Sequence, residues 1–228
     1  MLEAQAVTKV YETRGVQTDA LRGVDLQVGE GEFTALAGPS GSGKTTLLNL
    51  FGALDAPTSG RVTLEGQDLA ALTASQLAAL RLAKLGFVFQ AYNLIPVLSA
   101  VENVQFVMEL QGVPPAERRR RAMQILDEVE LADLAEKRPL EMSGGQQQRV
   151  AVARAIVSGP RVVLADEPTA NLDSRTAAQL LDLMEKMNQE RGVTFLFSTH
   201  DPQVIEKASR TVRLHDGAVC ADEWKRDL

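Results

Sequence analysis

Apolar and polar positions alternate along the chain with two different periods. Short apolar runs separated by glycine turns fill the first 37 residues and predict strands, the last of which leads into Gly38. Residues 44–53 then carry apolar side chains at helical spacing, and residues 56–69 predict a turn, a short strand and a second turn. The sequence up to about Phe89 is therefore expected to be rich in strands.

Helical spacing dominates the middle of the chain instead. Three stretches carry it, at residues 98–112, 115–135 and 144–157. Together they predict a helical subdomain over residues 90–157.

The last part of the chain alternates strand and helix. The apolar runs "RVVLAD", "VTFLFS" and "TVRLHDGAV" predict strands, and "SRTAAQLLDLMEKMNQERG" between the first two predicts a long helix. We expect a single α/β domain over residues 1–228, in which residues 1–89 and 158–228 form the core and residues 90–157 form an insert.

A glycine-rich stretch, "GPSGSGKTT", lies between the third predicted strand and the first predicted helix. It matches the phosphate-loop pattern Gly-x-x-x-x-Gly-Lys-Ser/Thr, whose backbone N–H groups and helix dipole bind phosphate oxygens. Lys44 is expected to contact the outer phosphates, and the Thr45 hydroxyl to ligate a magnesium ion held between them. The alternative is a flexible turn. The expected binding residues here are Gly38, Pro39, Ser40, Gly41, Ser42, Gly43, Lys44, Thr45 and Thr46.

Two carboxylates end the apolar run "RVVLADEP". Residues 162–165 predict a buried parallel strand, which places Asp166 at the strand end where ligands bind in open α/β sheets. Asp166 is expected to orient the magnesium ion, and Glu167 to polarise the water that attacks the terminal phosphate. The alternative is a capping acidic pair before Pro168.

A second helix start, in "MSGGQQQRVAVARAIV", offers another anion site by the same dipole and N–H argument. The alternative is a plain N-cap by Ser143 with glycines in the loop. One chain then carries two phosphate-facing helix ends and one lysine-bearing loop, so the second end is expected to complete a site in another copy. The residues concerned are Ser143, Gly144, Gly145 and Gln146.

Net charge, cysteine content and the length of the apolar runs exclude some classes of function. The 228 residues carry a net charge of −6, which argues against sequence-independent binding along nucleic-acid backbones. The single cysteine, Cys220, suits a reducing compartment. No secretory signal opens the sequence, and no apolar run approaches the roughly 20 residues of a membrane span. We expect a cytoplasmic protein whose work at a membrane depends on a partner.

These motifs together resemble the nucleotide-binding subunit of ABC transporters, from Tyr11 to His200. The phosphate loop, "SGGQ", "LADEPT", "ANLD" at residues 170–173 and "STHD" at residues 198–201 occur in the family's order. The resemblance implies an α/β fold: a P-loop NTPase (RecA-like) core with an N-terminal antiparallel β subdomain and an inserted α-helical subdomain. It also implies an ATPase in which two copies pack head to tail around ATP and Mg²⁺.

The resemblance also implies roles for four further residues. Gln90 matches the glutamine that contacts magnesium and water, although by itself it is a polar strand end. His200 matches the switch histidine beside the attacking water, although a lone histidine is usually surface. Tyr11 matches the aromatic that stacks on adenine, and a strand aromatic packed on the sheet is its alternative. Asp173 matches the carboxylate that couples the two sites.

Three longer segments resemble one branch of the family, the ATPases of lipoprotein release, macrolide efflux and cell division. They are "GFVFQAYNLIPVLSAVENV", "LFGALDAPTSG" and "ANLD". The resemblance implies a subunit on the inner face of the cell membrane, docked on a transmembrane permease that selects the substrate. The second function left open is a soluble ABC-type nucleotide switch acting on nucleic acid or ribosomes.

Overall fold

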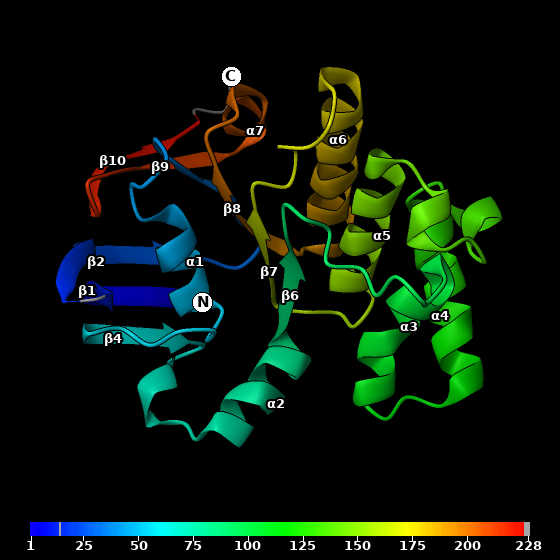
Figure 1. Cartoon of the computed structure of the whole chain (residues 1–228), viewed down its shortest axis with the longest axis horizontal. Coiled ribbons are helices and arrows are strands. Elements are labelled where there is room, and N and C mark those ends of the chain that lie inside the picture. The colour runs from blue at the N-terminus through cyan, green and yellow to red at the C-terminus, as the bar shows by residue number, and fades with distance from the viewer. Residues whose placement is uncertain (14, 226–228) are drawn as a thin grey trace.

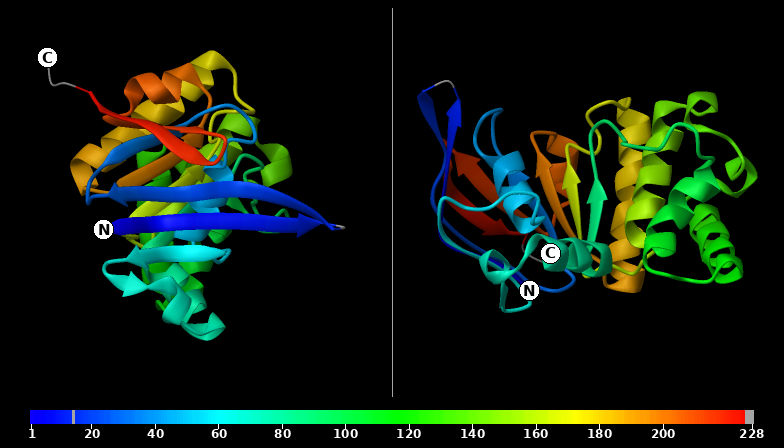
Figure 2. Two further views of the ribbon diagram at one scale, coloured as in Figure 1. Left: turned by 90° about the vertical axis from the view of Figure 1, so that its left-hand side faces the viewer. Right: turned by 60° about the horizontal axis from the view of Figure 1, so that its bottom comes forward.

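The computed structural model describes residues 1–13 and 15–225, and these form two β-sheets and two groups of helices (Figure 1). The first sheet has the strand order β2-β1-β4-β5 and is antiparallel. Its two long strands form an extended hairpin, seen side by side in Figure 2. The strands are β1 (Leu2–Thr13), β2 (Val16–Val28), β4 (Ser59–Leu64) and β5 (Gln67–Asp68).

The second sheet has the order β10-β9-β3-β8-β7-β6 and is parallel apart from its edge strand β10. Because parallel strands all end at the same edge, the segments that follow β3, β7 and β8 are brought together there. The strands are β3 (Phe33–Ala37), β6 (Leu85–Val88), β7 (Val162–Asp166), β8 (Thr194–Thr199), β9 (Arg210–His215) and β10 (Ala218–Trp224).

The central strands β3 and β8 are buried at every position because both faces of the sheet are covered. In β8, the side chains of Phe195 and Phe197 belong to one buried cluster, and Leu196 between them belongs to the other. Helix α1 (Lys44–Phe51) packs between the two sheets, and its Leu47, Leu50 and Phe51 side chains are fully buried there. The phosphate-loop stretch is thus anchored at both ends, by β3 and by α1.

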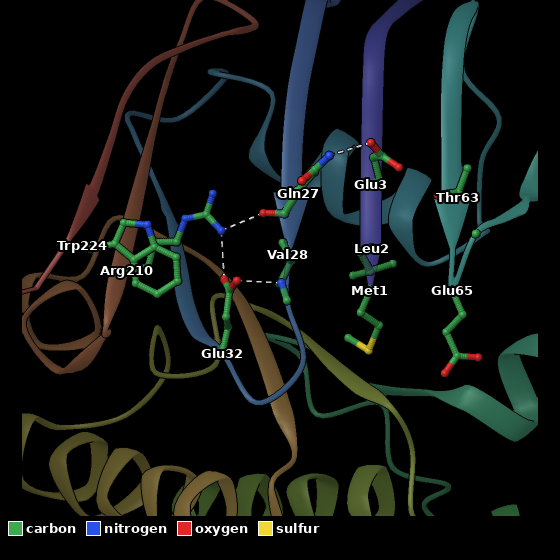
Figure 3. A pocket seen from close by; sticks show the side chains of 12 residues that line it. Met1, Leu2, Glu3, Gln27, Val28, Glu32, Thr63, Glu65, Arg210 and Trp224 are labelled. Atoms are coloured by element: carbon green, nitrogen blue, oxygen red, sulfur yellow. Dashed lines mark hydrogen bonds and ion pairs between the residues drawn. The ribbon is translucent and has the colours of Figure 1, made fainter.

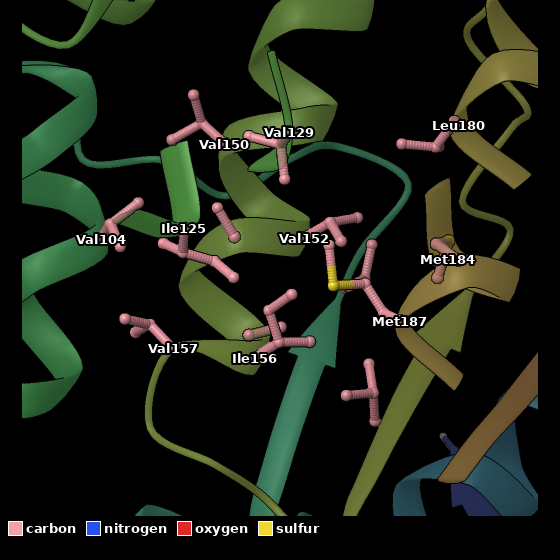
Figure 4. Close-up of a cluster of buried hydrophobic side chains, with 14 of the residues drawn as sticks. Val104, Ile125, Val129, Val150, Val152, Ile156, Val157, Leu180, Met184 and Met187 are labelled. Carbon is pink, nitrogen blue, oxygen red and sulfur yellow. The ribbon is translucent and has the colours of Figure 1, made fainter. Parts of the chain in front are cut away.

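The opposite face of the parallel sheet is covered by helices. Figure 4 shows valines, Ile156 and methionines from α3, α5 and α6 meeting in front of the strands, with Ile125 and Val129 beside them. Helix α5 lies at the centre of this cluster, and its Val150 and Val152 are fully buried. The helices are α3 (Ala100–Leu110), α4 (Pro115–Glu128), α5 (Gly144–Ile156) and α6 (Ser174–Arg191).

Two helices depart from the sequence expectation. The stretch before Phe89, expected to be rich in strands, contains α2 (Ala74–Lys84), which buries only Leu80 and so lacks an apolar stripe. Its start is nevertheless encoded as a capping box, in which Thr73 and Gln76 bond each other's backbone N–H. The second is α7 (Pro202–Lys207), which is too short for a helical period to be recognised. Within the described part of the chain, no helix combines the length and apolarity needed to cross a membrane.

Candidate functional site

A cavity of about 610 Å³ opens at the carboxyl edge of the parallel sheet, and most of the predicted site residues line it. It combines the ends of β3, β7 and β8 with the start of α1 and with residues of the long hairpin. Its predicted members are Tyr11, Pro39, Ser40, Gly41, Gly43, Lys44, Thr45, Thr46, Gln90, Asp166, Glu167 and His200.

The phosphate-loop stretch adopts a conformation that requires glycine at two positions. Gly41 and Gly43 have φ angles of 80° and 100°, in the left-handed region that L side chains avoid. A Cβ atom on Gly43 would lie 2.6 Å from the carbonyl oxygen of Ala20 on β2. The loop therefore follows the hairpin closely, and its backbone curls at the floor of the cavity.

Lys44 is buried, yet its ammonium group meets no anion in the part of the chain that the structure describes. Its Nζ donates to the carbonyl oxygens of Gly38 at 2.7 Å and Pro39 at 3.0 Å, both within the loop. The hydroxyl of Ser42 is also buried and has no partner among the described residues. A buried cation and an unpaired hydroxyl in a glycine-rich loop fit an anion such as a phosphate group.

Thr45 and Asp166 face each other across the cavity floor. The Thr45 hydroxyl donates to Oδ1 of Asp166 at 3.0 Å, although the two residues lie on α1 and β7. A hydroxyl and a carboxylate are the hard oxygen ligands that Mg²⁺ prefers, and the ion completes its shell with water and phosphate oxygens. These two residues thus fit a magnesium ion that is held jointly with a bound phosphate group.

Glu167 is held by contacts on both carboxylate oxygens. Nδ1 of His200 lies 2.8 Å from Oε1 and donates its N–H to this acceptor, and the Thr199 hydroxyl lies 3.4 Å from Oε2. The Glu167 backbone has φ 45°, a conformation that costs free energy and is typical of functional sites. The resulting pair of carboxylate and imidazole can hold a water molecule and accept its proton.

Tyr11 lies at the outer wall of the cavity and is about one third exposed. Its hydroxyl donates to Oδ2 of Asp55 at 2.9 Å, and burial together with this carboxylate raises the pKa of Tyr11. Lys9 places its ammonium 4.8 Å from the ring centroid. The exposed part of the ring offers an apolar surface to a planar group such as a base.

The second predicted helix end lies outside this cavity. Ser143 caps α5 through a capping box with Gln146, so the N-cap interpretation holds within one chain. Asp173 caps α6, and its hydrogen bonds from Thr176, above all from the hydroxyl, lower the pKa of Asp173. None of the "SGGQ" residues, nor Asp173, lines the cavity.

The sequence reasoning missed four residues that line the cavity: Thr18, Asp19, Ala20 and Ala170. The first three face Tyr11 because β1 and β2 pair with Tyr11 opposite Thr18 and Val10 opposite Asp19. A hairpin turn at Gly15 would have predicted that these residues lie opposite Tyr11. Ala170 follows the Glu167 turn, and only the fold places it at the cavity.

The glycines of "SGGQ" also make room for neighbouring side chains, which gives a first testable prediction. A Cβ atom on Gly145 would lie 2.3 Å from Cγ2 of Thr176. We expect Gly145→Ala to lower the free energy of unfolding by about 1–3 kcal/mol. The β-branched side chain of Thr176, in the first turn of α6, has few alternative rotamers and cannot easily move away from the new methyl group. Adding Thr176→Ser removes the clashing methyl group and keeps the hydroxyl bond to Asp173, so it should restore most of the loss. Urea unfolding of both variants measures this, and a double variant no more stable than Gly145→Ala would contradict it.

A second cavity of similar size, about 580 Å³, lies at the opposite edge of the sheets (Figure 3). Its acidic and basic side chains already bond other side chains. Arg210 pairs with Glu32 at 2.9 Å and with Asp222 at 2.7 Å, and its guanidinium lies 4.9 Å from the Trp224 ring centroid. Glu3 accepts from Gln27, as the dashed line in Figure 3 shows. In the described part of the chain, the acidic and basic side chains that line this cavity are therefore each engaged by another side chain, unlike Lys44 in the first cavity.

Comparison with known proteins identifies relatives of the whole chain. A family model described as "ABC transporter" matches residues 21–170. The chain is 47% identical over 222 residues to the lipoprotein-releasing system ATP-binding protein LolD of Anaeromyxobacter dehalogenans, and it spans 93% of that protein. It is 43% identical over 228 residues to the macrolide export ATP-binding/permease protein MacB of Brucella melitensis biotype 1, but spans only 35% of that relative's length.

A solved structure has the same fold along the entire chain. The ATP-binding cassette MJ0796, a dimer in a post-hydrolysis state bound to ADP and Pi, superposes with a TM-score of 0.92 at 42% identity, and each chain is covered completely. The predicted fold class, a P-loop NTPase core with an antiparallel β part and a helical part, is confirmed. The predicted boundaries at residues 89/90 and 157/158 and the roles of the individual site residues stay predictions.

Proposed function

The chain belongs to the ABC transporter family, and on that premise we propose that it binds and hydrolyses ATP as one half of a pair that drives a membrane permease. The observation that carries the proposal is that some of the expected nucleotide-binding groups share one cavity while another lies outside it. A buried ammonium, a hydroxyl–carboxylate pair and a carboxylate–imidazole pair surround one cavity. The second anion-binding helix end, at Ser143, lies apart from it.

In this proposal each residue type has a distinct task. Lys44 and the loop N–H groups bind the phosphates, and the Tyr11 ring supports the base. Thr45 and Asp166, with Gln90 at the cavity wall, would hold a magnesium ion, which would supply positive charge to the phosphate oxygens.

Glu167 carries out the proton transfer. It orients the attacking water and accepts its proton, while the N–H of His200 fixes the carboxylate. Both groups lie in the same cavity as the phosphate loop, so the water they hold would meet the terminal phosphate.

Completion of the site requires a second copy of the chain. The helix dipole and free N–H groups at the start of α5 have no anion within the described residues, and a head-to-tail pair would place them over the phosphates of the partner's ATP. Asp173, at the start of α6, would then contact the partner. The solved structure of MJ0796 is a dimer bound to ADP and Pi, which supports the pairing of two copies.

We further propose a permease partner of the lipoprotein-release or macrolide-efflux type, which would hold the chain on the inner face of the cell membrane. The names of LolD and MacB support this, since one is part of a lipoprotein-releasing system and the other joins ATP-binding and permease parts in one protein. The net charge of −6 adds no support for a nucleic-acid partner.

The proposed pairing can be tested at Ser143. In a chain that binds but does not hydrolyse ATP, such as the Glu167→Gln variant, ATP with magnesium should double the mass seen by light scattering. Adding Ser143→Arg should abolish this doubling, because a long cation at the helix start blocks the anion site and the closely packed interface. The affinity of the single chain for ATP, measured by fluorescence titration, should be unchanged.

Gln124→Arg is the matched control, since Gln124 is also exposed but lies on α4. This variant should still pair with ATP. Ser143→Arg also removes a helix cap, which costs about 1 kcal/mol, so its melting temperature must show that it is folded. A folded Ser143→Arg chain that pairs as readily as the control would overturn the head-to-tail arrangement.

A further inference from the structure

The segment that carries Gln90 is held by side chains from two other parts of the chain. Nδ2 of Asn171 donates to the carbonyl oxygen of Gln90 at 2.9 Å. Nε2 of Gln148, on α5, donates to the carbonyl oxygen of Phe89 at 3.4 Å and to that of Pro168 at 2.7 Å. Gln148 is fully buried, so it joins α5 to the two turns that bear Gln90 and Glu167.

A second residue of α5, Arg154, makes two further contacts with this segment. Its Nη1 donates to the carbonyl oxygen of Asn93 at 2.6 Å, and its Nη2 to that of Tyr92 at 3.0 Å. Burial lowers the pKa of Arg154. Among the described residues, its guanidinium donates to these two backbone carbonyl oxygens and takes part in no ion pair. A half-buried guanidinium without an anion is costly, and here both of its terminal nitrogens bond the Gln90 segment.

The Gln90 segment in turn fits α5 closely. Tyr92 and Asn93 have φ angles of 58° and 48°, two consecutive strained residues whose carbonyl groups both bond Arg154. The hydroxyl of Tyr92 lies against the first glycine of "SGGQ": a Cβ atom on Gly144 would be 2.7 Å from it. The segment therefore touches α5 both at its first turn, through Tyr92, and near its end, through Arg154.

We propose that Arg154 is a positioning residue that fastens the Gln90 segment to α5, so that Gln90 and the "SGGQ" helix end move as one body. The proposal rests on the proposed function, in which Gln90 serves the ATP of its own chain and the helix end serves the ATP of the partner. Arg154 then links the two ATP sites of the pair. When the ATP of the partner displaces the helix end, Gln90 moves with it at the ATP site of its own chain.

The test compares Arg154→Met with Arg121→Met in the full chain. Arg121, on α4, also donates from its guanidinium to a backbone carbonyl, that of Val157 at 3.0 Å, but lies outside the nucleotide cavity. For Arg154→Met we expect kcat of ATP hydrolysis to fall by about 10- to 100-fold, because small misplacements of a positioned group cost that much. The Kd of the single chain for ATP should stay unchanged. Hydrogen exchange of residues 89–95 in the nucleotide-free chain should increase.

For Arg121→Met we expect a comparable loss of thermal stability with kcat and the exchange of residues 89–95 unchanged. Unchanged exchange in Arg154→Met would overturn the fastening itself. Increased exchange with normal kcat would overturn the positioning role and leave only a structural one. A wild-type chain that binds no ATP or does not hydrolyse it would overturn the proposed function, and with it this link, whereas a loss confined to Arg154→Met supports both.

Discussion

Replacing Glu167 by glutamine should stall ATP hydrolysis while leaving ATP binding intact. The amide has the size of the carboxylate and can still accept the N–H of His200 through its oxygen, so the geometry of the pair is kept. It cannot accept a proton from water, and loss of a general base slows a reaction by about 10²- to 10⁴-fold. ATP with magnesium should then accumulate a stable pair of chains, measurable by light scattering alongside phosphate release.

Glu206→Gln is the matched control for this variant, because Glu206 is exposed on α7 and lines no part of the cavity. It should hydrolyse ATP at the wild-type rate and show no accumulated pair. If Glu167→Gln hydrolysed ATP at the same rate as this control, Glu167 would not be the base, and its strained backbone would need another explanation.

Replacing Lys44 by alanine should weaken nucleotide binding itself. The Lys44 ammonium is buried at the cavity floor, and its partners among residues 1–13 and 15–225 are two loop carbonyl oxygens, so a phosphate group would meet its full charge. A hydrogen bond to a charged group contributes about 1.5–3 kcal/mol, which corresponds to about a tenfold to 100-fold rise in Kd. Titration with a fluorescent ATP analogue measures the change directly.

A control variant and a stability measurement separate the loss of phosphate binding from other effects of the substitution. Lys186→Ala, at an exposed position of α6, removes the same charge from the chain without touching the cavity, and its ATP affinity should stay at the wild-type value. Removing Lys44 also leaves the carbonyl oxygens of Gly38 and Pro39 without their donor, so the melting temperature is needed to separate a local effect from unfolding. A stable Lys44→Ala chain with normal affinity for ATP would refute the phosphate cradle.

The glycine-rich loop and the carboxylate beside it could be located from the sequence because their geometry is local. A glycine-rich turn between a buried strand and a helix start has few possible conformations, and Asp166 follows directly from the end of an apolar strand. Parallel strands then bring those ends to one edge, which explains the contact between Thr45 and Asp166 across 121 residues of sequence.

Other parts of the site depend on contacts that no local pattern encodes. Tyr11 meets Thr18 and Asp19 only through the register of a hairpin that contains three irregular steps. The partners of Arg154 are backbone carbonyls, which every residue possesses, so side-chain identity does not reveal them. Helix α2 escaped recognition because it buries a single leucine.

The sequence by itself determined the chemistry of the groups: a lysine-bearing glycine loop, a carboxylate pair after a buried strand, a histidine after another, and a second helix end with free N–H groups. Tertiary structure decided which of these share a cavity. It gathered the first three at one edge of the sheet and left the "SGGQ" end outside, at the start of a helix whose Arg154 bonds the carbonyl oxygens of Tyr92 and Asn93. The reason is that the chemical properties of a residue are set by its side chain, whereas the distance between two residues depends on which apolar faces pack together.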